Sequence, residues 1–341
     1  MNRQFIKKTA YNLSKPFPLK WMRRLSDQHF IFPFYHVVTD HPSPCIKHLF
    51  PVTTEKQFKR DLDFLLRNFS PAGYPEVKNF LEKGKKADKP LFFLSFDDGF
   101  AECNEIIAPI LKAKGIPAAF FINPDFVGNK QLSHRQKVSL IIDKILQPDN
   151  SILEKRAGKL TPSPISGKAT LIQWVKSLTI TDTELIHDMA SIYDVDFVKA
   201  LDTYQPYMSL AQIQQLKADG FIIGSHSLNH PEFNLLSEEE MKQQIEGSFQ
   251  YLENQLHTEY RVFSFPFHDI GIPSSFFNFL VHEVNVEASF GTSGIKNDNA
   301  PNHIQRIPLE LSGFHQSEEI IRSEYFYYLV KILFGKNRIR R

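Results

Sequence analysis

The feature that most constrains the fold is an alternation of short apolar segments with amphipathic segments along most of the chain. Short runs rich in aromatic and β-branched residues have the composition of buried strands: residues 30–38, 91–96, 118–123, 221–225, 261–266, 286–290 and 304–308. Helical periodicity separates most of these runs, for example over residues 102–114, which Gly115 ends, and from Ser237 to about residue 256. About seven strands that alternate with helices favour an α/β fold with parallel strands and helices packed outside them.

One long stretch, residues 127–207, interrupts this alternation. It is mainly helical, contains a loop of Pro, Ser and Gly at residues 161–168, and the strand–helix pattern resumes directly after it. An insertion therefore fits better than a second domain. We expect a basic N-terminal segment over residues 1–29, an α/β domain over residues 30–310 with the insertion at about 127–207, and a basic helical tail over residues 311–341.

Composition excludes several classes of protein. A chain of 341 residues with 42% hydrophobic and 23% charged residues has ample material for a core, so disorder is excluded as its main state. Two cysteines exclude a disulfide framework and a thiolate-based zinc site. The longest apolar run, residues 325–334, contains Lys331 and is about half of the ~20 residues that cross a bilayer. We expect a soluble protein.

The two ends of the chain are basic, although the net charge is only +2. Residues 1–24 hold seven bases and residues 331–341 hold five, without an acid in either segment, which leaves 28 bases against 38 acids elsewhere. Basic ends that also carry aromatic residues suit an anionic membrane surface or nucleic acid, and solvated, partly packed tails are the simpler alternative. Nucleic acid fits less well, because the rest of the chain is acidic and no recognition module is evident. No apolar stretch typical of a signal peptide is evident near the N-terminus, so we expect a cytoplasmic protein, peripheral to the membrane if the basic ends bind lipid.

The sequence Ser-Phe-Asp-Asp-Gly, from Ser95 to Gly99, closes the predicted strand 91–96. Carboxylates at the carboxyl end of a parallel strand lie where α/β folds build their sites. A turn at Gly99 brings both Asp97 and Asp98 to one rim, where one carboxylate binds a metal and the other holds or deprotonates a water. A polar turn without function is the alternative.

A second polar motif, His-Ser-Leu-Asn-His-Pro, starts at His226 and follows the predicted strand 221–225. On a helical turn, His226 and His230 at positions i and i+4 face the same way, at a spacing that lets both bind one metal. Such a pair is also common as ordinary polar surface. Its place at the end of a neighbouring strand favours the site, because one carboxylate and two imidazoles give the open three-ligand arrangement of a catalytic zinc site.

Both motifs resemble those of the polysaccharide deacetylase family, carbohydrate esterase family 4, which is defined by the NodB homology domain. The sequence at Asp97 and Asp98 is similar to the first family motif, and the sequence from His226 is similar to the second, His-Ser/Thr-x-x-His-Pro. The resemblance covers residues 30 to about 310 and implies a distorted (β/α)7 barrel, similar to a TIM barrel, with the helical insertion.

The resemblance also implies the roles of these residues. Asp97 is the expected general base, and Asp98, His226 and His230 are the expected ligands of a divalent metal, with Zn²⁺ favoured and Co²⁺ or Ni²⁺ compatible with the same ligands. The reaction is removal of an N-acetyl group from an amino sugar or polysaccharide, which makes an N-acetylated sugar or glycan the expected partner. A backbone N–H near the third motif is expected to stabilise the oxyanion.

The sequence departs from the family at two points. The third motif, Arg-x-Pro-Tyr/Phe, aligns with Ser264 to Phe267, so that serine replaces the arginine that orients the base. Arg306 is our candidate substitute. A late Leu-x-His motif that supplies the general acid has no match. His268 and His315 are candidates for that role, and the alternative is a site without a dedicated acid, in which the metal-bound water or Asp97 returns the proton.

Further residues are expected to contact the substrate, and two other functions stay open. Four residues are weaker candidates for contact with the substrate or the oxyanion: His36, Phe267, His268 and Arg306. A carbohydrate-binding protein that has lost catalysis is one alternative function. An amidase that acts on a non-sugar amide is another, because residues around the metal do not select the substrate.

Overall fold

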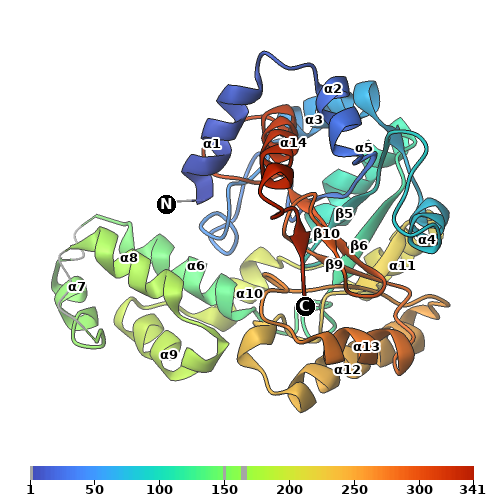
Figure 1. Ribbon diagram of the computed structural model, residues 1–341. Helices are drawn as coiled ribbons and strands as arrows, with labels where there is room; N and C mark the ends of the chain where they lie inside the picture. The colour runs from blue at the N-terminus through green and yellow to red at the C-terminus, as the bar shows by residue number, and fades with distance from the viewer. Residues whose placement is uncertain (1–2, 149–150, 163–166) are drawn as a thin grey trace.

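The computed structural model describes residues 3–148, 151–162 and 167–341. Its centre is a parallel sheet with the strand order β11–β9–β8–β7–β6–β5–β2–β12 (Figure 1). The strands are β2 (Pro33–Tyr35), β5 (Leu94–Phe96), β6 (Ala118–Ile122), β7 (Ile222–Ser225), β8 (Val262–Ser264), β9 (Ala288–Gly291), β11 (His303–Gln305) and β12 (Ile307–Pro308).

One chain segment joins the two edges of this sheet. Strands β11 and β12 are consecutive and are separated only by Arg306, yet β11 pairs with β9 and β12 pairs with β2. The amide of Arg306 donates to the Gly291 carbonyl (3.1 Å), and the next amide, of Ile307, donates to the Phe32 carbonyl (2.8 Å). The sheet is thus a seven-stranded barrel with one divided strand, which confirms the predicted (β/α)7 architecture.

Two of the predicted strands are shorter than expected. The first halves of residues 30–38 and 91–96 leave the barrel as β1 (Phe30–Ile31) and β4 (Leu91–Phe92), which pair in a separate sheet with β3 (Ser70–Pro71). Pro33 has no N–H to donate at the break between β1 and β2. Residues 36–38 were wrongly included in the first strand, because the amides of His36 and Val37 donate to the Glu310 carboxylate (2.9 and 3.1 Å) instead of to a neighbouring strand.

Helices cover the outside of the barrel, and their ends follow the sequence signals. The hydroxyl of Ser237 accepts from the Glu240 amide (3.3 Å) at the start of α12 (Glu238–Leu256), and Gly115 ends α5 (Ala108–Lys114) with φ +63°. The helix predicted over 102–114 begins as a π-helix, Cys103–Ile107, before α5. The other elements around the barrel are α3 (Glu55–Asn68), α4 (Tyr74–Glu82), α11 (Leu210–Ala218), the 3₁₀ turn Phe233–Leu235 and α13 (Ser274–His282).

Aromatic side chains fill part of the barrel interior. Phe32, Phe93, Phe121 and Phe290 pack together in a cluster distinct from the main core. A Cβ atom at Gly224 would lie 2.5 Å from the Phe121 ring, so the close approach of β7 to this ring requires glycine. The interior is therefore a packed core below the carboxyl ends of the strands.

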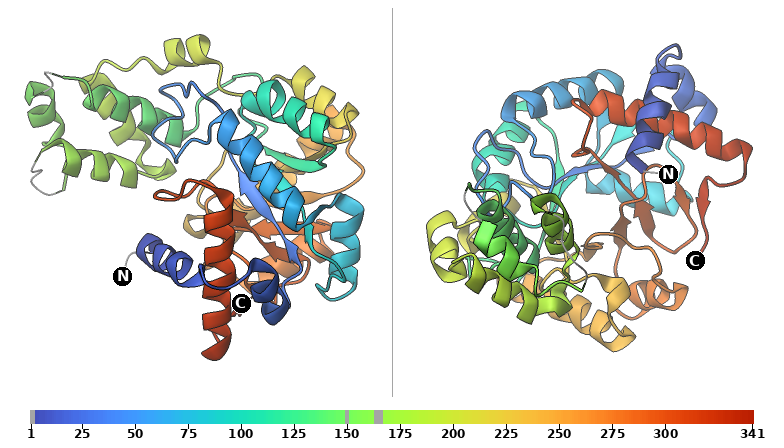
Figure 2. Two further views of the ribbon diagram at one scale, coloured as in Figure 1. Left: turned by 90° about the horizontal axis from the view of Figure 1, so that it is seen from above. Right: turned by 90° about the vertical axis from the view of Figure 1, so that its left-hand side faces the viewer.

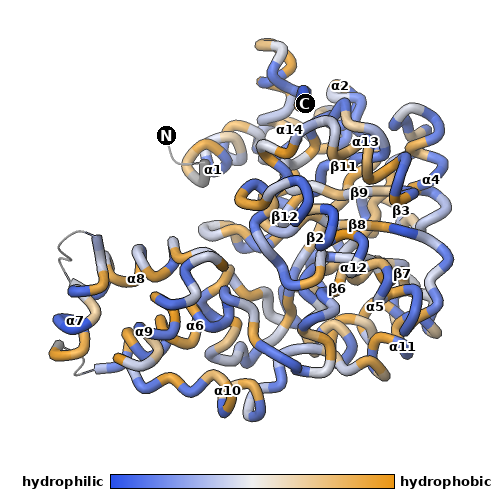
Figure 3. The backbone as a smooth tube through the Cα atoms, turned by 90° about the horizontal axis from the view of Figure 1, so that it is seen from below, coloured by the Kyte–Doolittle hydropathy of each residue, from blue (hydrophilic) through white to orange (hydrophobic). Residues whose placement is uncertain are grey.

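The insertion forms a helical lobe at one side of the barrel (Figures 1 and 2). Its elements are α6 (His134–Ile145), α7 (Ser151–Ala157), α8 (Lys168–Ser177), the 3₁₀ turn Ile180–Asp182, α9 (Thr183–Ile192) and α10 (Phe197–Tyr204). These helices have a hydrophobic cluster of their own. Figure 3 shows hydrophobic and hydrophilic stretches alternating along them, as expected of helices that bury one face.

Three helices from the two ends of the chain pack together beside the barrel. They are α1 (Arg3–Ser14), α2 (Leu19–Ser26) and α14 (Ser317–Leu333), and α14 contacts both of the others. A short strand after α14, β13 (Arg338–Ile339), pairs with β10 (Asn297–Asp298). Across the described residues, no helix combines the length and the hydropathy that a membrane span needs.

Candidate active site

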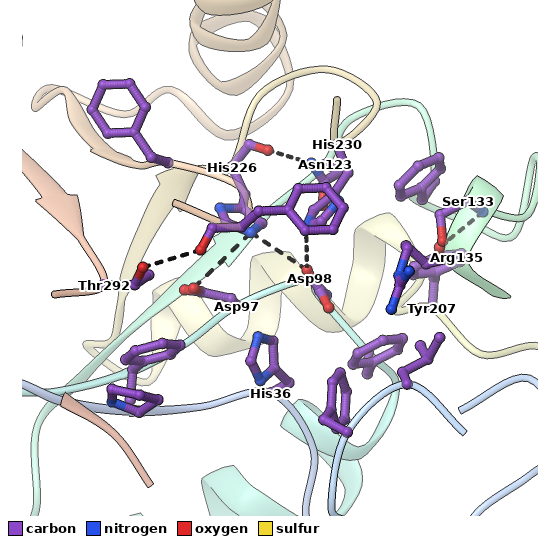
Figure 4. Close-up of a pocket in the computed structure, with 18 residues that line it drawn as sticks. His36, Asp97, Asp98, Asn123, Ser133, Arg135, Tyr207, His226, His230 and Thr292 are labelled. Atoms are coloured by element: carbon purple, nitrogen blue, oxygen red, sulfur yellow. Dashed lines mark hydrogen bonds and ion pairs between the residues drawn. The ribbon is translucent and has the colours of Figure 1, made fainter. Parts of the chain in front are cut away.

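The two polar motifs meet at the carboxyl ends of β5 and β7 (Figure 4). Asp97 and Asp98 follow β5, and the segment from His226 to His230 follows β7. Asp98 itself has φ +73° and Gly99 has φ +69°, so two successive left-handed residues turn the chain there. A Cβ atom at Gly99 would lie 3.1 Å from Ile122 Cγ2, which leaves little space for any larger residue.

Asp98 lies between the two histidines. Its Oδ1 is 3.4 Å from His226 Nε2 and 3.2 Å from His230 Nε2. One ligand atom from each of these three side chains lies within 4.8 Å of the others, which is close enough for a single ion. The structure thus brings together the three residues that the sequence nominated as metal ligands.

The expected helical turn at the histidines is wrong. Residues 226–230 form a loop in which Ser227 and His230 have φ values of +67° and +60°. Side chains replace the helical hydrogen bonds: Gln244 Oε1 accepts from the Leu228 amide (3.0 Å), and Asn123 donates to the Ser227 carbonyl (3.1 Å). The two imidazoles converge because these polar contacts hold the loop.

The protonation of this group fits a cation. His226 Nδ1 lies 2.8 Å from the Ser264 carbonyl, which only accepts, so Nδ1 carries a proton and Nε2 is the ring nitrogen that faces Asp98. Asp98 Oδ1 is buried and makes no hydrogen bond within the described part of the chain. Burial alone disfavours its charge, but the neighbouring His230 and His226 hold the pKa of Asp98 well below its usual range. Two imidazole nitrogens and a carboxylate oxygen are a typical zinc donor set.

Asp97 is bound by a buried arginine. Arg306 Nη1 lies 2.8 Å from Asp97 Oδ1, and Nη2 lies 2.6 Å from Oδ2. The same guanidinium donates to the hydroxyls of Ser95 (2.9 Å) and Ser264 (2.6 Å). Burial opposes the charge on Asp97, but Arg306 and His226 lower its pKa below the usual value. Arg306 thus reaches the carboxylate from the divided strand, and its Nη2 bonds both Asp97 and Ser264.

Arg306 is completely buried, with no exposed surface. It packs over the Phe34 ring at 4.2 Å and binds Asp97, and both of these residues line the cavity whereas Arg306 does not. The expectation that Arg306 touches substrate is therefore wrong as a direct contact, because its five donors are turned to protein groups. Arg306 binds Asp97 from the side that faces away from the cavity.

His36 faces the same cavity and is paired with an acid. Its Nδ1 lies 2.6 Å from Glu310 Oε2, and its ring stacks on Phe50 at 4.4 Å. Burial alone lowers the basicity of this ring, but the Glu310 carboxylate raises the pKa of His36 to about 9. His36 is therefore protonated at neutral pH.

These residues line a cavity of about 290 Å³, at the lower end of ligand pockets, which hold ~300–1,000 Å³. Phe267 is part of its wall, and its ring lies 4.7 Å from that of His230. The lobe contributes Ser133 and Arg135. Within the described residues, neither His268 nor His315 lines this cavity, and His315 is exposed.

Three residues of the site were not singled out by the sequence. Asn123 ends a predicted strand and was detectable as a polar residue at the same edge of the sheet. Glu310 was not, because its contact with His36 depends on how the barrel closes. Arg135 lies in the insertion, where no pattern indicated which residues face the barrel.

Comparison with known proteins agrees with this fold. The family model of polysaccharide deacetylase matches residues 84–158 and 183–272. Among solved structures, the deacetylase PplD of Streptococcus pyogenes in complex with acetate aligns with a TM-score of 0.54 and 13% identity, over 86% of this chain and 97% of its own. IcaB from Ammonifex degensii aligns with a TM-score of 0.54 and 15% identity, over 87% and 97%.

The polysaccharide deacetylase BC0361 of Bacillus cereus aligns with a TM-score of 0.51 and 13% identity, over 87% of this chain and 69% of its own. At such identities these structures share the fold with this chain. No curated protein matches the sequence. The two motifs, their common rim and the family match together show that the chain belongs to the polysaccharide deacetylase family.

Proposed function

We propose that this protein is a metal-dependent deacetylase that hydrolyses the N-acetyl amide of an amino sugar within a glycan. The observation that carries the proposal is the convergence of Asp98, His226 and His230 beside an Asp97 that is held by Arg306. Zn²⁺ is the ion that we favour, and Co²⁺ or Ni²⁺ suits the same ligands. When bound, such an ion polarises the amide carbonyl and lowers the pKa of the attacking water.

In this proposal two side chains carry out the two proton transfers: Asp97 accepts a proton and His36 donates one. Asp97 is deprotonated because its pKa is low, and its Oδ2 lies 4.0 Å from His226 Nε2, on the side of the ligand atoms. It therefore accepts the proton of the attacking water. His36 is protonated and lines the same cavity, so it donates a proton to the nitrogen of the leaving amine. Arg306 and Glu310 keep these two groups in opposite charge states.

The two alternative functions stand differently. The missing motif arginine and the missing Leu-x-His motif are the two reasons to consider a binding protein without activity, and for the first of them Arg306 supplies a guanidinium to Asp97. Hydrolysis of a non-sugar amide uses the same groups, and only substrates distinguish it. The cytoplasmic location stays a prediction.

The test is acetate release from a panel of N-acetylated amino sugars and oligosaccharides, with an N-acetylated amino acid as the non-sugar amide. We expect release from sugars with added Zn²⁺ or Co²⁺, and none with a chelator. Asp97→Asn should lower turnover by about a thousandfold or more while one equivalent of metal is retained, and Asp98→Asn should lose the metal.

The matched control is Asp88→Asn, which removes a carboxylate that is 92% exposed. It should leave turnover and metal content unchanged. Full activity in Asp97→Asn would contradict the assignment of the base. Release from the amino acid alone would show that the substrate is not a sugar.

A further inference from the structure

The exposed hydrophobic side chains of this protein are concentrated at its two ends. Of the fourteen large hydrophobic residues that are exposed in the described chain, eight belong to α1, α2, the linker between them, or the end of α14: Phe5, Leu13, Phe17, Trp21, Leu25, Ile332, Leu333 and Phe334. The other six are scattered over the barrel and the lobe. We call this surface of α1, α2 and the end of α14 the terminal-helix surface.

The centre of this surface is an aromatic stripe. Phe17, Trp21 and Leu25 follow one another at four-residue spacing and are 36%, 49% and 53% exposed. Phe17 stacks on Trp21 at 5.4 Å and on Phe326 of α14 at 6.0 Å, so the stripe is fixed to the helix beneath it. The opposite face of α2 is buried. Helix α2 thus buries Leu19 and Met22 and also exposes two large apolar side chains, Trp21 and Leu25, to solvent.

The bases around this stripe are exposed. Lys15, Lys20 and Arg24 are exposed beside the stripe. Lys7 is different, because it forms a buried ion pair with Glu324 of α14. Further exposed bases follow α14: Lys336, Arg338 and Arg340. Asp27, just after α2, is the nearest exposed acid in sequence.

We propose that the terminal-helix surface binds the surface of an anionic lipid bilayer, with the stripe at the boundary of headgroups and acyl chains. An exposed Trp and Phe flanked by Lys and Arg is the composition that lies in such an interface. Charge complementarity selects the partner, because the exposed bases face outward here while the rest of the chain carries 28 bases against 38 acids. The binding is peripheral, since no described helix is long and apolar enough to cross a bilayer.

The fold leaves this surface free to bind. Figure 2 (left) shows the chain crossing over α14 between α1 and α2, so that these helices lie on the outside of the molecule. The proposed catalytic residues follow β2, β5 and β7, and no described residue of α1, α2 or α14 lines the cavity. Membrane binding and hydrolysis are therefore separable by mutation.

The experiment is co-sedimentation of the full chain with vesicles of pure phosphatidylcholine or of phosphatidylcholine with one third phosphatidylglycerol. We expect binding to the anionic vesicles at about 0.05 M salt, weaker binding at about 0.5 M, and little binding to the neutral ones. The double variant Lys20→Glu/Trp21→Glu should lower the partition coefficient by about tenfold or more. The matched control is Val198→Glu/Lys199→Glu, which alters an exposed hydrophobic residue and an exposed base on the lobe helix α10 and should bind as the unmodified protein does.

A second measurement keeps the test independent of the charge changes. In Trp174→Phe, Trp21 is the remaining tryptophan, and its fluorescence should shift to shorter wavelength when anionic vesicles are added. Acetate release from a soluble sugar should be the same in all four proteins, which separates this proposal from the proposed function. No sedimentation at low salt would overturn the proposal. Equal loss in the lobe control, or a change in molar mass of the Trp21 variant in light scattering that indicates a lost dimer, would overturn it too.

Discussion

The charge of Asp97 depends on one contact, because the carboxylate is buried and Arg306 donates to both of its oxygens. Arg306→Gln removes the positive charge and keeps the shape approximately. Since Arg306 lowers the pKa of Asp97, the variant should raise that pKa, so that the acidic limb of the pH–rate profile moves to higher pH. We expect turnover to fall by about a hundredfold or more at neutral pH. The profile of kcat against pH measures both effects, and an unchanged acidic limb would contradict the assignment.

The position of the guanidinium can be moved back to the third motif. Ser264 Oγ lies 2.6 Å from Arg306 Nη2, so an arginine at position 264 starts next to the place where the guanidinium is needed. The double variant Ser264→Arg/Arg306→Gln should therefore regain part of the activity that Arg306→Gln loses, and its acidic limb should return toward the original pH. Ser264→Lys/Arg306→Gln is the control, because lysine cannot bind both carboxylate oxygens at once. Equal rescue by lysine would show that charge alone matters.

For the second charged pair of the site, His36 and Glu310, removal of the partner should lower a pKa, whereas removal of Arg306 should raise one. Glu310 raises the pKa of His36 to about 9, so Glu310→Gln should lower that pKa by removing the carboxylate. A raised histidine pKa stabilises the fold fully below the ordinary value of about 6.5, and this stabilisation is lost as the pH rises through about 9. NMR titration of the His36 ring in metal-free protein measures the shift. Glu287→Gln changes a partly exposed acid just before β9, at the opposite end of the strands from His36, and should leave the His36 pKa unchanged.

The sequence predicts a single functional residue only where a motif shows that a particular side chain is needed. Arg306 was identifiable because Ser264 stands in place of an arginine and the base still needs one. The partner of His36 was not identifiable, since Glu310 lies 274 positions away and reaches it only once the barrel has closed. The two general acid candidates chosen from the sequence, His268 and His315, are not among the described residues that line the cavity. The closure of the barrel decides which residues line it, and the sequence alone does not show this.

Helix α6 brings the lobe into contact with the catalytic cavity. Arg135, in its first turn, lines the cavity and lies over the Phe267 ring at 5.9 Å, while its Nη1 donates to the Lys176 carbonyl of the lobe (3.0 Å). It makes no contact with Asp97 or Asp98 that would place it at the reacting atoms. Arg135→Gln should therefore raise KM by about tenfold with kcat changed less than about twofold.

Steady-state kinetics on the best substrate of the panel measures this effect. Arg156→Gln, an exposed arginine on α7, is the matched control and should change neither constant. A fall in kcat for Arg135→Gln with unchanged KM would assign Arg135 to the chemical step instead of to substrate binding.

Elements were predictable where local signals decide them. A side-chain cap such as the one at Ser237 involves residues only three positions apart, so the start of the helix can be recognised in the sequence. Buried strands are recognised by their distinctive composition. The loop from His226 to His230 was not predictable, because Gln244 and Asn123 hold it from elsewhere in the chain. Similarly, a single apolar run became β1 and β2 because its two halves find different neighbours.

The whole molecule is tied together by contacts that cross most of the sequence. The segment with β11 and β12 closes the barrel, and alternate residues on β11 point to opposite sides, with Ile304 in the interior cluster and His303 and Gln305 outside. Outside, Arg341 forms ion pairs with Asp298 (2.6 Å) and with Asp269. Its side chain is 5% exposed and lies over the Phe277 ring at 4.5 Å. This contact joins the strand β13 to the barrel wall.

Arg341→Met tests whether that contact stabilises the molecule as a whole. Removing one partner leaves two buried carboxylates without their cation, so we expect a loss of about 3–5 kcal/mol and a fall in Tm of roughly 5–10 °C at pH 7. Burial opposes the charges of Asp269 and Asp298, but His303 and Arg341 lower the pKa of both. A lowered pKa stabilises the fold above the ordinary value of about 4, and the effect is lost as the pH falls through the native pKa. The difference in Tm between the variant and the unmodified protein should therefore narrow below about pH 4. Arg340→Met removes the exposed neighbouring base and should leave Tm unchanged. Equal Tm values for Arg341→Met and the unmodified protein would contradict the prediction. They would mean that the cost of burying these charges cancels their attraction.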